Sequence, residues 1–279
     1  MSDGIPAETP LLSASKLLAS ILSSSSEGQP LSSSSLAKLK LAHKLLSNLD
    51  PYLDEVSSKA PEIQKPLLKA TAENDWEGAW KRGETMFQLT PAWSAGAYEG
   101  NFVGMMTRIM NAKNALEVGM FTGTTTVCIA SSLPKDGKVI ALEIDPYLAN
   151  FVKPHFDASG HGDKIDVRVG GAAESLVKIG EEGHQFEIIF IDADKPGYLS
   201  YYKTIMEKNL LKKGGLLVVD NTLYKGSPFA PEIVDFDDEI SKPNADAITE
   251  FNKVVAADER VEVVLLPLRD GVTFIMNKE

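Results

Sequence analysis

The stretch Glu117-Val-Gly-Met-Phe-Thr-Gly123 joins the end of an apolar run to the start of a helical segment, and the rest of the chain can be followed outward from it. The apolar run is Ala115–Val118, and the helical segment is Thr125–Ser132. Gly119 and Gly123 allow the backbone to turn sharply and to come close to a ligand. A strand, a glycine turn and a helix in this order predict the first unit of an α/β domain.

Strand and helix patterns alternate after Asn111. Further apolar runs occupy Val139–Leu142, Ile165–Val169, Phe186–Ile191 and Leu216–Val219. The helical segments between them are Tyr147–Asp157, Ala172–Ile179 and Tyr198–Lys208. Nearly continuous apolar strands separated by helices are typical of a parallel sheet covered on both faces. With right-handed crossovers, this pattern predicts a doubly wound, Rossmann-like α/β domain.

The end of the chain follows a different pattern. A helix near Asp246–Ala257 precedes two β-rich runs, Val261–Pro267 and Val272–Met276. The Asp270-Gly271 pair between these runs is typical of a hairpin turn. The sequence therefore predicts that a C-terminal antiparallel hairpin completes the sheet.

The region before the sheet is predicted to contain two parts. Twelve of the first 36 residues are serine, which indicates a flexible leader over residues 1–35. Residues 36–98 are expected to form an N-terminal helical extension, and the main α/β domain is expected over 99–279. Leucines from Leu36 to Leu49 recur at near-helical spacing, which favours an amphipathic helix packed on the main domain over one on a membrane surface. Further helices are expected at Pro61–Thr71, Trp76–Gln88 and Glu99–Met110, and the tryptophans Trp76, Trp80 and Trp93 are expected to pack in the core or against loops.

Composition excludes several classes of function. The 39 acidic and 28 basic residues give a net charge of −11, which argues against binding to nucleic acid or an anionic membrane. One cysteine, Cys128, and four histidines make a disulfide framework or a zinc centre improbable. No apolar stretch reaches the length that a bilayer requires, and no basic secretory signal is present. A cytoplasmic protein that acts on a small molecule is expected.

The glycine turn and the next strand predict a nucleoside site. The turn has the frame E-x-G-x-x-x-G, whereas a dinucleotide site needs G-x-G-x-x-G to bind a pyrophosphate. This frame suits a ligand without a diphosphate, such as S-adenosylmethionine (SAM). Glu143 ends the next strand, where a carboxylate can accept hydrogen bonds from both ribose hydroxyls. Because NAD sites use the same device, an NAD-dependent oxidoreductase is the alternative.

Acidic side chains follow the fourth and fifth strands. Asp192 follows Phe186–Ile191, and Asp220 and Asn221 follow Leu216–Val219. Ligands of open α/β sheets bind beyond the carboxyl ends of the strands, so these three side chains are expected to meet there. Three oxygen ligands suit Mg²⁺, Mn²⁺ or Ca²⁺. Lys195 could remove a proton from a hydroxyl near that cation, and the positive charge and partial burial would lower the pKa of Lys195.

From about Glu99 to the C-terminus, the chain resembles the cation-dependent class I O-methyltransferases, the group that contains the caffeoyl-coenzyme A and catechol O-methyltransferases. The stretches that carry this resemblance are Leu116–Gly123, Ile191–Lys195, Val219–Leu223 and Leu266–Val272. Leu49–Asp54 and Phe251–Asp258 are similar to the O-methyltransferases of cyanobacterial mycosporine-like amino acid biosynthesis.

The resemblance implies a set of functional residues. It implies that Asp192, Asp220 and Asn221 bind the metal, and that Lys195, with Asp192, is catalytic. The residues that it implies for the SAM site are Glu117, Gly119, Gly123, Thr125, Glu143, Ala172 and Asp192. It also implies a homodimer.

The substrate is expected to be a small hydroxylated molecule. Tyr224 stands where the plant enzymes carry a tryptophan, and the segment 235–244 is acidic. The phosphates of coenzyme A require arginine or lysine, which this segment supplies poorly. A free vicinal diol or enediol is therefore expected, such as a catechol, another phenolic secondary metabolite or a precursor of the gadusol type.

Overall fold

The computed structural model describes residues 10–24, 29–235 and 240–278 of the chain. The chain forms two compact units, Met1–Lys59 and Ala60–Glu279. The division into a leader, a helical extension and a catalytic domain at residues 35 and 98 stays a prediction.

The first unit is helical where it is described. It contains α1 (Pro10–Ser24), α2 (Ser33–Ser47) and α3 (Leu49–Val56). Within the segment predicted to be a flexible leader, α1 is therefore an ordered helix, while residues 1–9 and 25–28 lie outside the described residues. The Ser32 hydroxyl accepts a hydrogen bond from the Ser35 amide at 3.0 Å, and this serine cap explains why α2 begins at Ser33.

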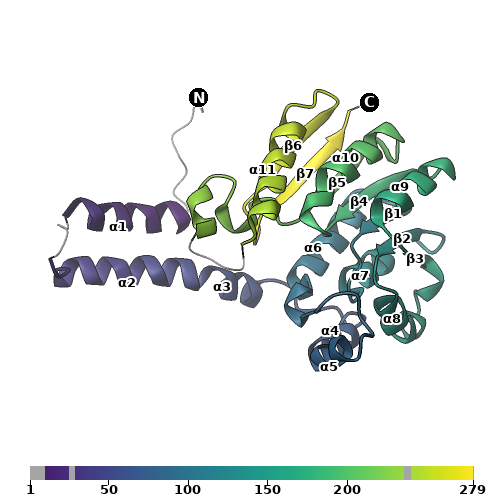
Figure 1. Cartoon of the computed structure of the whole chain (residues 1–279), viewed down its shortest axis with the longest axis horizontal. Helices are drawn as coiled ribbons and strands as arrows, with labels where there is room; N and C mark the ends of the chain where they lie inside the picture. Colours follow the sequence, from purple (N-terminus) through teal and green to yellow (C-terminus); the bar gives the residue numbers. More distant parts are fainter. Residues whose placement is uncertain (1–9, 25–28, 236–239, 279) are drawn as a thin grey trace. The chain divides into compact units, whose positions relative to one another are not determined.

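The second unit is built on one seven-stranded sheet with the order β3-β2-β1-β4-β5-β7-β6 (Figure 1). Its strands are β1 (Asn114–Val118), β2 (Lys138–Glu143), β3 (Ile165–Val169), β4 (Phe186–Ile191), β5 (Leu211–Val219), β6 (Val261–Leu266) and β7 (Val272–Asn277). The pairs among the first five strands are parallel, whereas β7 is antiparallel to both β5 and β6. The predicted doubly wound sheet with a C-terminal hairpin is confirmed.

Helices cover both faces of this sheet. On one face, α9 (Ala172–Glu181), α10 (Tyr198–Glu207) and α11 (Lys242–Ala256) bury a core that includes Leu176, Tyr202 and Phe251. The helices α4 (Lys65–Glu73), α5 (Trp76–Lys81), α6 (Gly96–Ile109), α7 (Thr124–Ser132) and α8 (Pro146–Ala158) contribute to the other cores. In the described ranges, no helix is both long and apolar enough to cross a membrane.

The predicted helix Trp76–Gln88 is too long. Helix α5 ends at Lys81, and the chain reverses at Gly83, whose φ of +70° lies in the left-handed region. The Glu84 amide donates a hydrogen bond to the Ala79 carbonyl at 3.0 Å, which is the bond of a Schellman motif. The sequence signal for this end was Gly83 itself, because glycine adopts this conformation without strain.

A buried lysine closes the carboxyl end of α7. The Lys164 ammonium donates hydrogen bonds to the carbonyls of Ala130 at 3.1 Å and Leu133 at 2.8 Å. Its side chain is 7% exposed, so water cannot replace it. The last carbonyls of a helix have no partner within the helix, and a cation also stabilises this end of the helix dipole.

We expect Lys164→Met to lower the free energy of unfolding by about 2 kcal/mol, because two buried carbonyls lose their partner. Urea unfolding followed by circular dichroism measures this change. Lys138→Met is the matched control, since the exposed Lys138 also donates to one carbonyl, that of Asp163, at 2.5 Å. Equal losses in the two variants would contradict the assigned role of Lys164.

Candidate active site

The carboxyl ends of β1, β4 and β5 lie side by side. Val118 pairs with Ile191, and Ile191 pairs with Val219. The Asp192 amide donates to the Val118 carbonyl at 2.9 Å, and the Asp220 amide donates to the Ile191 carbonyl at 2.9 Å. The glycine turn and the acidic strand ends therefore lie at the same edge of the sheet, as the sequence predicts.

Gly119 lies directly against the end of β4. Its φ is +94°, and an added Cβ would lie 2.0 Å from the Asp192 carbonyl oxygen. The amides of Gly119 and Met120 both donate to the Leu142 carbonyl, at 3.1 and 3.0 Å. The turn is therefore held by β2 on one side and by β4 on the other, and position 119 has no room for a side chain.

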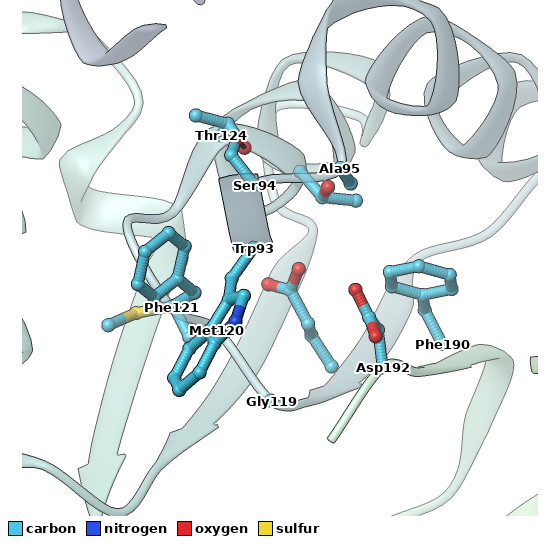
Figure 2. Close-up of a pocket in the computed structure, with 11 residues that line it drawn as sticks. Trp93, Ser94, Ala95, Gly119, Met120, Phe121, Thr124, Phe190 and Asp192 are labelled. Atoms are coloured by element: carbon cyan, nitrogen blue, oxygen red, sulfur yellow. Dashed lines mark hydrogen bonds between the residues drawn. The ribbon is translucent and has the colours of Figure 1, made fainter. Parts of the chain in front are cut away.

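A pocket opens where this turn meets the segment before α6 (Figure 2). Trp93 and Phe121 lie side by side on one side of it, and Asp192 and Phe190 lie on the other. Four of the residues predicted for the cofactor line the pocket: Glu117, Gly119, Thr125 and Asp192. Gly123, Glu143 and Ala172 are not among the lining residues.

These three residues have other surroundings. An added Cβ at Gly123 would lie 2.4 Å from the Phe156 ring, so close packing on α8 explains this glycine. Ala172 is the first residue of α9. The Glu143 carboxylate accepts hydrogen bonds from the Phe121 amide at 2.8 Å and the Asp145 amide at 2.9 Å. Burial raises the pKa of Glu143, although these amides act against the rise.

Glu117 is a buried carboxyl that lines the pocket. It is 1% exposed and is hydrogen-bonded to the Thr126 hydroxyl. Burial raises the pKa of Glu117 to about 8, and the negative charges of Asp192 and Glu143 act in the same direction. At neutral pH this carboxyl is therefore protonated in the folded chain.

Asp220 and Asn221 stand beside Asp192 at the edge of the sheet. Asp220 is 3% exposed and accepts a hydrogen bond from the Asn221 amide at 2.7 Å. Burial raises the pKa of Asp220 well above its ordinary value, and the nearby carboxylates of Asp192 and Glu99 raise it further. The described residues contain no group of three or more His, Cys, Asp or Glu side chains arranged to hold a metal ion. Two aspartates and an amide, with a third carboxylate nearby, nevertheless supply the oxygen atoms and negative charge that fit a hard divalent cation.

Lys195 points back to the same edge. Its Nζ donates hydrogen bonds to Asp192 Oδ1 at 3.2 Å, to the Ala193 carbonyl at 3.0 Å and to the Tyr198 hydroxyl at 2.8 Å. Burial opposes the protonated form, but the interaction with the Tyr198 hydroxyl and the negative charge of Asp192 outweigh it and raise the pKa of Lys195. The lowered pKa expected from the sequence is not found in this arrangement of the chain, where the side chain is a charged ammonium.

Trp93 is a pocket residue that the sequence analysis placed among the packing tryptophans. It is 53% exposed, and its ring centroid lies 6.3 Å from that of Phe121. By contrast, Trp76 is buried as expected, at 5% exposure. Phe121 belongs to the glycine turn, so its place in that motif was a signal for a role in the pocket. Trp93 lies far from the turn in sequence and gave no such signal.

Comparisons with known proteins identify the relatives of this chain. A family model described as O-methyltransferase matches residues 54–278. The caffeoyl-CoA O-methyltransferase of Eucalyptus gunnii is 36% identical over 241 residues, which cover 84% of this chain and 90% of the relative. Caffeoyl-CoA O-methyltransferase 1 of Arabidopsis thaliana is 33% identical over 249 residues, which cover 86% and 90% of the two chains.

Solved structures agree with this result. The O-methyltransferase from Bacillus cereus, solved in complex with SAH (S-adenosylhomocysteine), is 25% identical with a TM-score of 0.67, and the match covers 82% of this chain and 97% of that one. The SAH-bound methyltransferase PaMTH1 from Podospora anserina is 24% identical and shares the fold. Its TM-score is 0.69, with coverage of 85% and 96%.

We expect Gly119→Ala to lower the free energy of unfolding by about 2–4 kcal/mol, because the added Cβ must push the end of β4 away. Binding of SAH, measured by titration calorimetry, is expected to weaken with it. Gly171→Ala is the control, since an added Cβ there meets nothing closer than Glu174 Oε2 at 3.7 Å. A free energy of unfolding equal to that of Gly171→Ala would contradict the close approach seen here.

The raised pKa of Glu117 predicts a pH-dependent cost in stability. In the ligand-free protein, the folded state binds one more proton than the unfolded state between pH 4.5 and about 8, so stability falls as pH rises through that window. Glu117→Gln removes this term. Its stability relative to the parent is expected to rise by about 1.4 kcal/mol per pH unit in the window. Urea unfolding at several pH values measures the difference, and a difference independent of pH would refute the assignment.

Proposed function

The chain belongs to the O-methyltransferase family that includes the caffeoyl-CoA O-methyltransferases and is a SAM-dependent O-methyltransferase, and on this premise we propose a metal-dependent reaction on a small free diol. The methyl group of SAM would pass to one of two adjacent hydroxyls of a catechol or of an enediol of the gadusol type. The observation that carries this proposal is the position of Asp192. Its side chain lines the pocket, is hydrogen-bonded to Lys195 and lies near Asp220.

We assign the pocket beneath Trp93 and Phe121 to SAM. Glu117, Gly119, Thr125 and Asp192 line it and support this assignment. Glu143 lies one strand away and can still bind the ribose. A carboxylate has about four acceptor positions, and the Phe121, Ile144 and Asp145 amides leave one of those of Glu143. The roles of Gly123 and Ala172 in binding SAM belong to the same proposal.

We assign Asp192, Asp220 and Asn221 as the residues that would hold a divalent cation, with Mg²⁺ first and Mn²⁺ or Ca²⁺ as alternatives. When bound, such a cation supplies positive charge that orients the two hydroxyls and favours the deprotonated oxygen. Asp192, Asp220 and Glu99 together can carry more negative charge than the Lys195 ammonium can balance. This imbalance supports the assignment, because unpaired negative charge in a buried site is unfavourable.

Lys195 is the proposed base. In its neutral form, Nζ accepts the proton of the reacting hydroxyl, while the bond from that oxygen to the methyl carbon forms and the carbon–sulfur bond of SAM breaks. The products are the methyl ether, SAH and the lysine ammonium, which returns its proton to solvent. In the structure, Nζ is hydrogen-bonded to Asp192 Oδ1, which supports its presence at the reacting edge. Orientation of donor and acceptor supplies much of the remaining rate enhancement.

A free diol is favoured over a coenzyme A thioester. The segment 235–244 carries several carboxylates, which repel the phosphates of coenzyme A. Tyr224 is 8% exposed, and its hydroxyl accepts a hydrogen bond from Asn244 Nδ2 at 3.0 Å. This contact joins the loop after β5 to the first turn of α11. The likeness of Leu49–Asp54 and Phe251–Asp258 to the mycosporine-pathway enzymes supports an enediol acceptor.

The test is methyl transfer from labelled SAM in the presence of Mg²⁺ to catechol, to a demethylated gadusol precursor and to caffeoyl-CoA. We expect methylation of the free diols, loss of activity with EDTA and recovery when Mg²⁺ is added back. Lys195→Ala is expected to lower kcat by about 10²–10⁴-fold with little change in SAM affinity.

Lys203→Ala is the control for Lys195→Ala, because Lys203 is an exposed lysine on α10. Methylation of caffeoyl-CoA alone would overturn the substrate assignment. Full activity in metal-free enzyme would overturn the metal assignment.

A further inference from the structure

The Lys195 ammonium uses all of its hydrogen-bonding capacity. An ammonium has three N–H donors, and Nζ has three acceptors: Asp192 Oδ1, the Ala193 carbonyl and the Tyr198 hydroxyl. The first two belong to the same short segment as Lys195, within three residues of it. Tyr198 is the first residue of α10, and the distance from Nζ to its hydroxyl, 2.8 Å, is the shortest of the three.

The Tyr198 ring is fixed by the core. It is 0% exposed, and its ring packs edge-on against Phe251 of α11, with 5.8 Å between centroids and 78° between planes. The Lys195 Nζ also lies 4.9 Å from the centroid of the Tyr198 ring. A buried aromatic ring has few rotamers, so its hydroxyl is a rigid reference point, whereas a lysine side chain has four rotatable bonds.

We propose that Tyr198 is a positioning residue for the methyl transfer, whose hydroxyl holds the Lys195 amine in place relative to the sheet edge. This inference rests on the proposed function. If Asp192 binds the cation, its carboxylate is no longer free to fix Nζ, and of the two other contacts only the Tyr198 hydroxyl belongs to a side chain held in the core. Tyr198 is then the contact that keeps Nζ at the distance that proton transfer requires, and a displacement of about 1 Å can cost about 10²-fold in rate.

Tyr202 provides a matched control on the same helix. It is 1% exposed, and its ring also packs edge-on against Phe251, at 6.2 Å and 89°. Its hydroxyl donates one hydrogen bond of 2.7 Å, but to Asp258 Oδ2 instead of the lysine. Tyr198→Phe and Tyr202→Phe therefore each remove one hydroxyl that contacts a charged group from similar packing, and only the first removes a contact to Lys195.

The experiment compares Tyr198→Phe, Tyr202→Phe, Lys195→Ala and the double variant Lys195→Ala with Tyr198→Phe. The full chain is assayed with SAM, Mg²⁺ and catechol, and with caffeoyl-CoA if it is the better acceptor. The measurements are kcat, KM for both substrates, SAH affinity and melting temperature. SAH affinity separates a loss of positioning from a loss of folding.

We expect Tyr198→Phe to lower kcat at least about tenfold, the equivalent of one hydrogen bond to a charged group, with KM and SAH affinity within about twofold of the parent. Tyr202→Phe is expected to keep the parental kcat with a similar change in melting temperature. In the Lys195→Ala background, Tyr198→Phe is expected to have no further effect, because the group that it positions is gone.

Two results would overturn the inference while the proposed function stands. One is a Tyr198→Phe kcat equal to that of Tyr202→Phe while Lys195→Ala is slow. The other is an equal further loss from Tyr198→Phe in the Lys195→Ala background, which would show a general structural effect. Full activity of Lys195→Ala would instead overturn both the proposed base and the positioning role that depends on it.

Discussion

The close approach of Gly119 to the Asp192 carbonyl is the contact on which the arrangement of the site depends. An added Cβ at position 119 would lie 2.0 Å from that oxygen, so the ends of β1 and β4 can meet only without a side chain there. Asp192 thereby takes part in two regions at once. Its backbone meets the glycine turn, and its side chain contacts Lys195 and lines the pocket. The pocket and the acidic edge are adjacent for this reason.

Buried negative charge is the second feature of the site. Glu117 relieves it by taking up a proton, since its pKa rises to about 8. At the edge of the sheet, Lys195 is the cation that faces Asp192, and the pKa of Asp220 is still raised by burial and by the Asp192 and Glu99 carboxylates. A site that carries this charge is costly without a ligand and fits a divalent cation. The same charge keeps the Lys195 ammonium protonated in the ligand-free chain.

A buried side chain of the core of the second unit contacts the proposed base. Phe251 of α11 packs against Tyr198 of α10, and the Tyr198 hydroxyl contacts Lys195 Nζ. The next tyrosine on this side of α10, Tyr202, contacts the same phenylalanine but ends at Asp258. Similar packing therefore leads to a contact with Asp258 at one position and with the proposed base at the other.

Local pattern was sufficient for the sheet and for the acidic edge. Apolar runs of four to six residues identified β1–β4, and the Asp270-Gly271 turn identified the terminal hairpin, because both signals come from neighbours along the chain. Asp192, Asp220 and Asn221 could be placed together because parallel strands end at the same edge. Trp93, the packing of Gly123 on Phe156 and the contacts of Lys195 with Tyr198 and Asp192 could not be foreseen in this way. Each depends on how the chain packs in three dimensions, on which side a ring turns or on how a flexible side chain is held, and the order of residues along the chain carries no direct record of such packing.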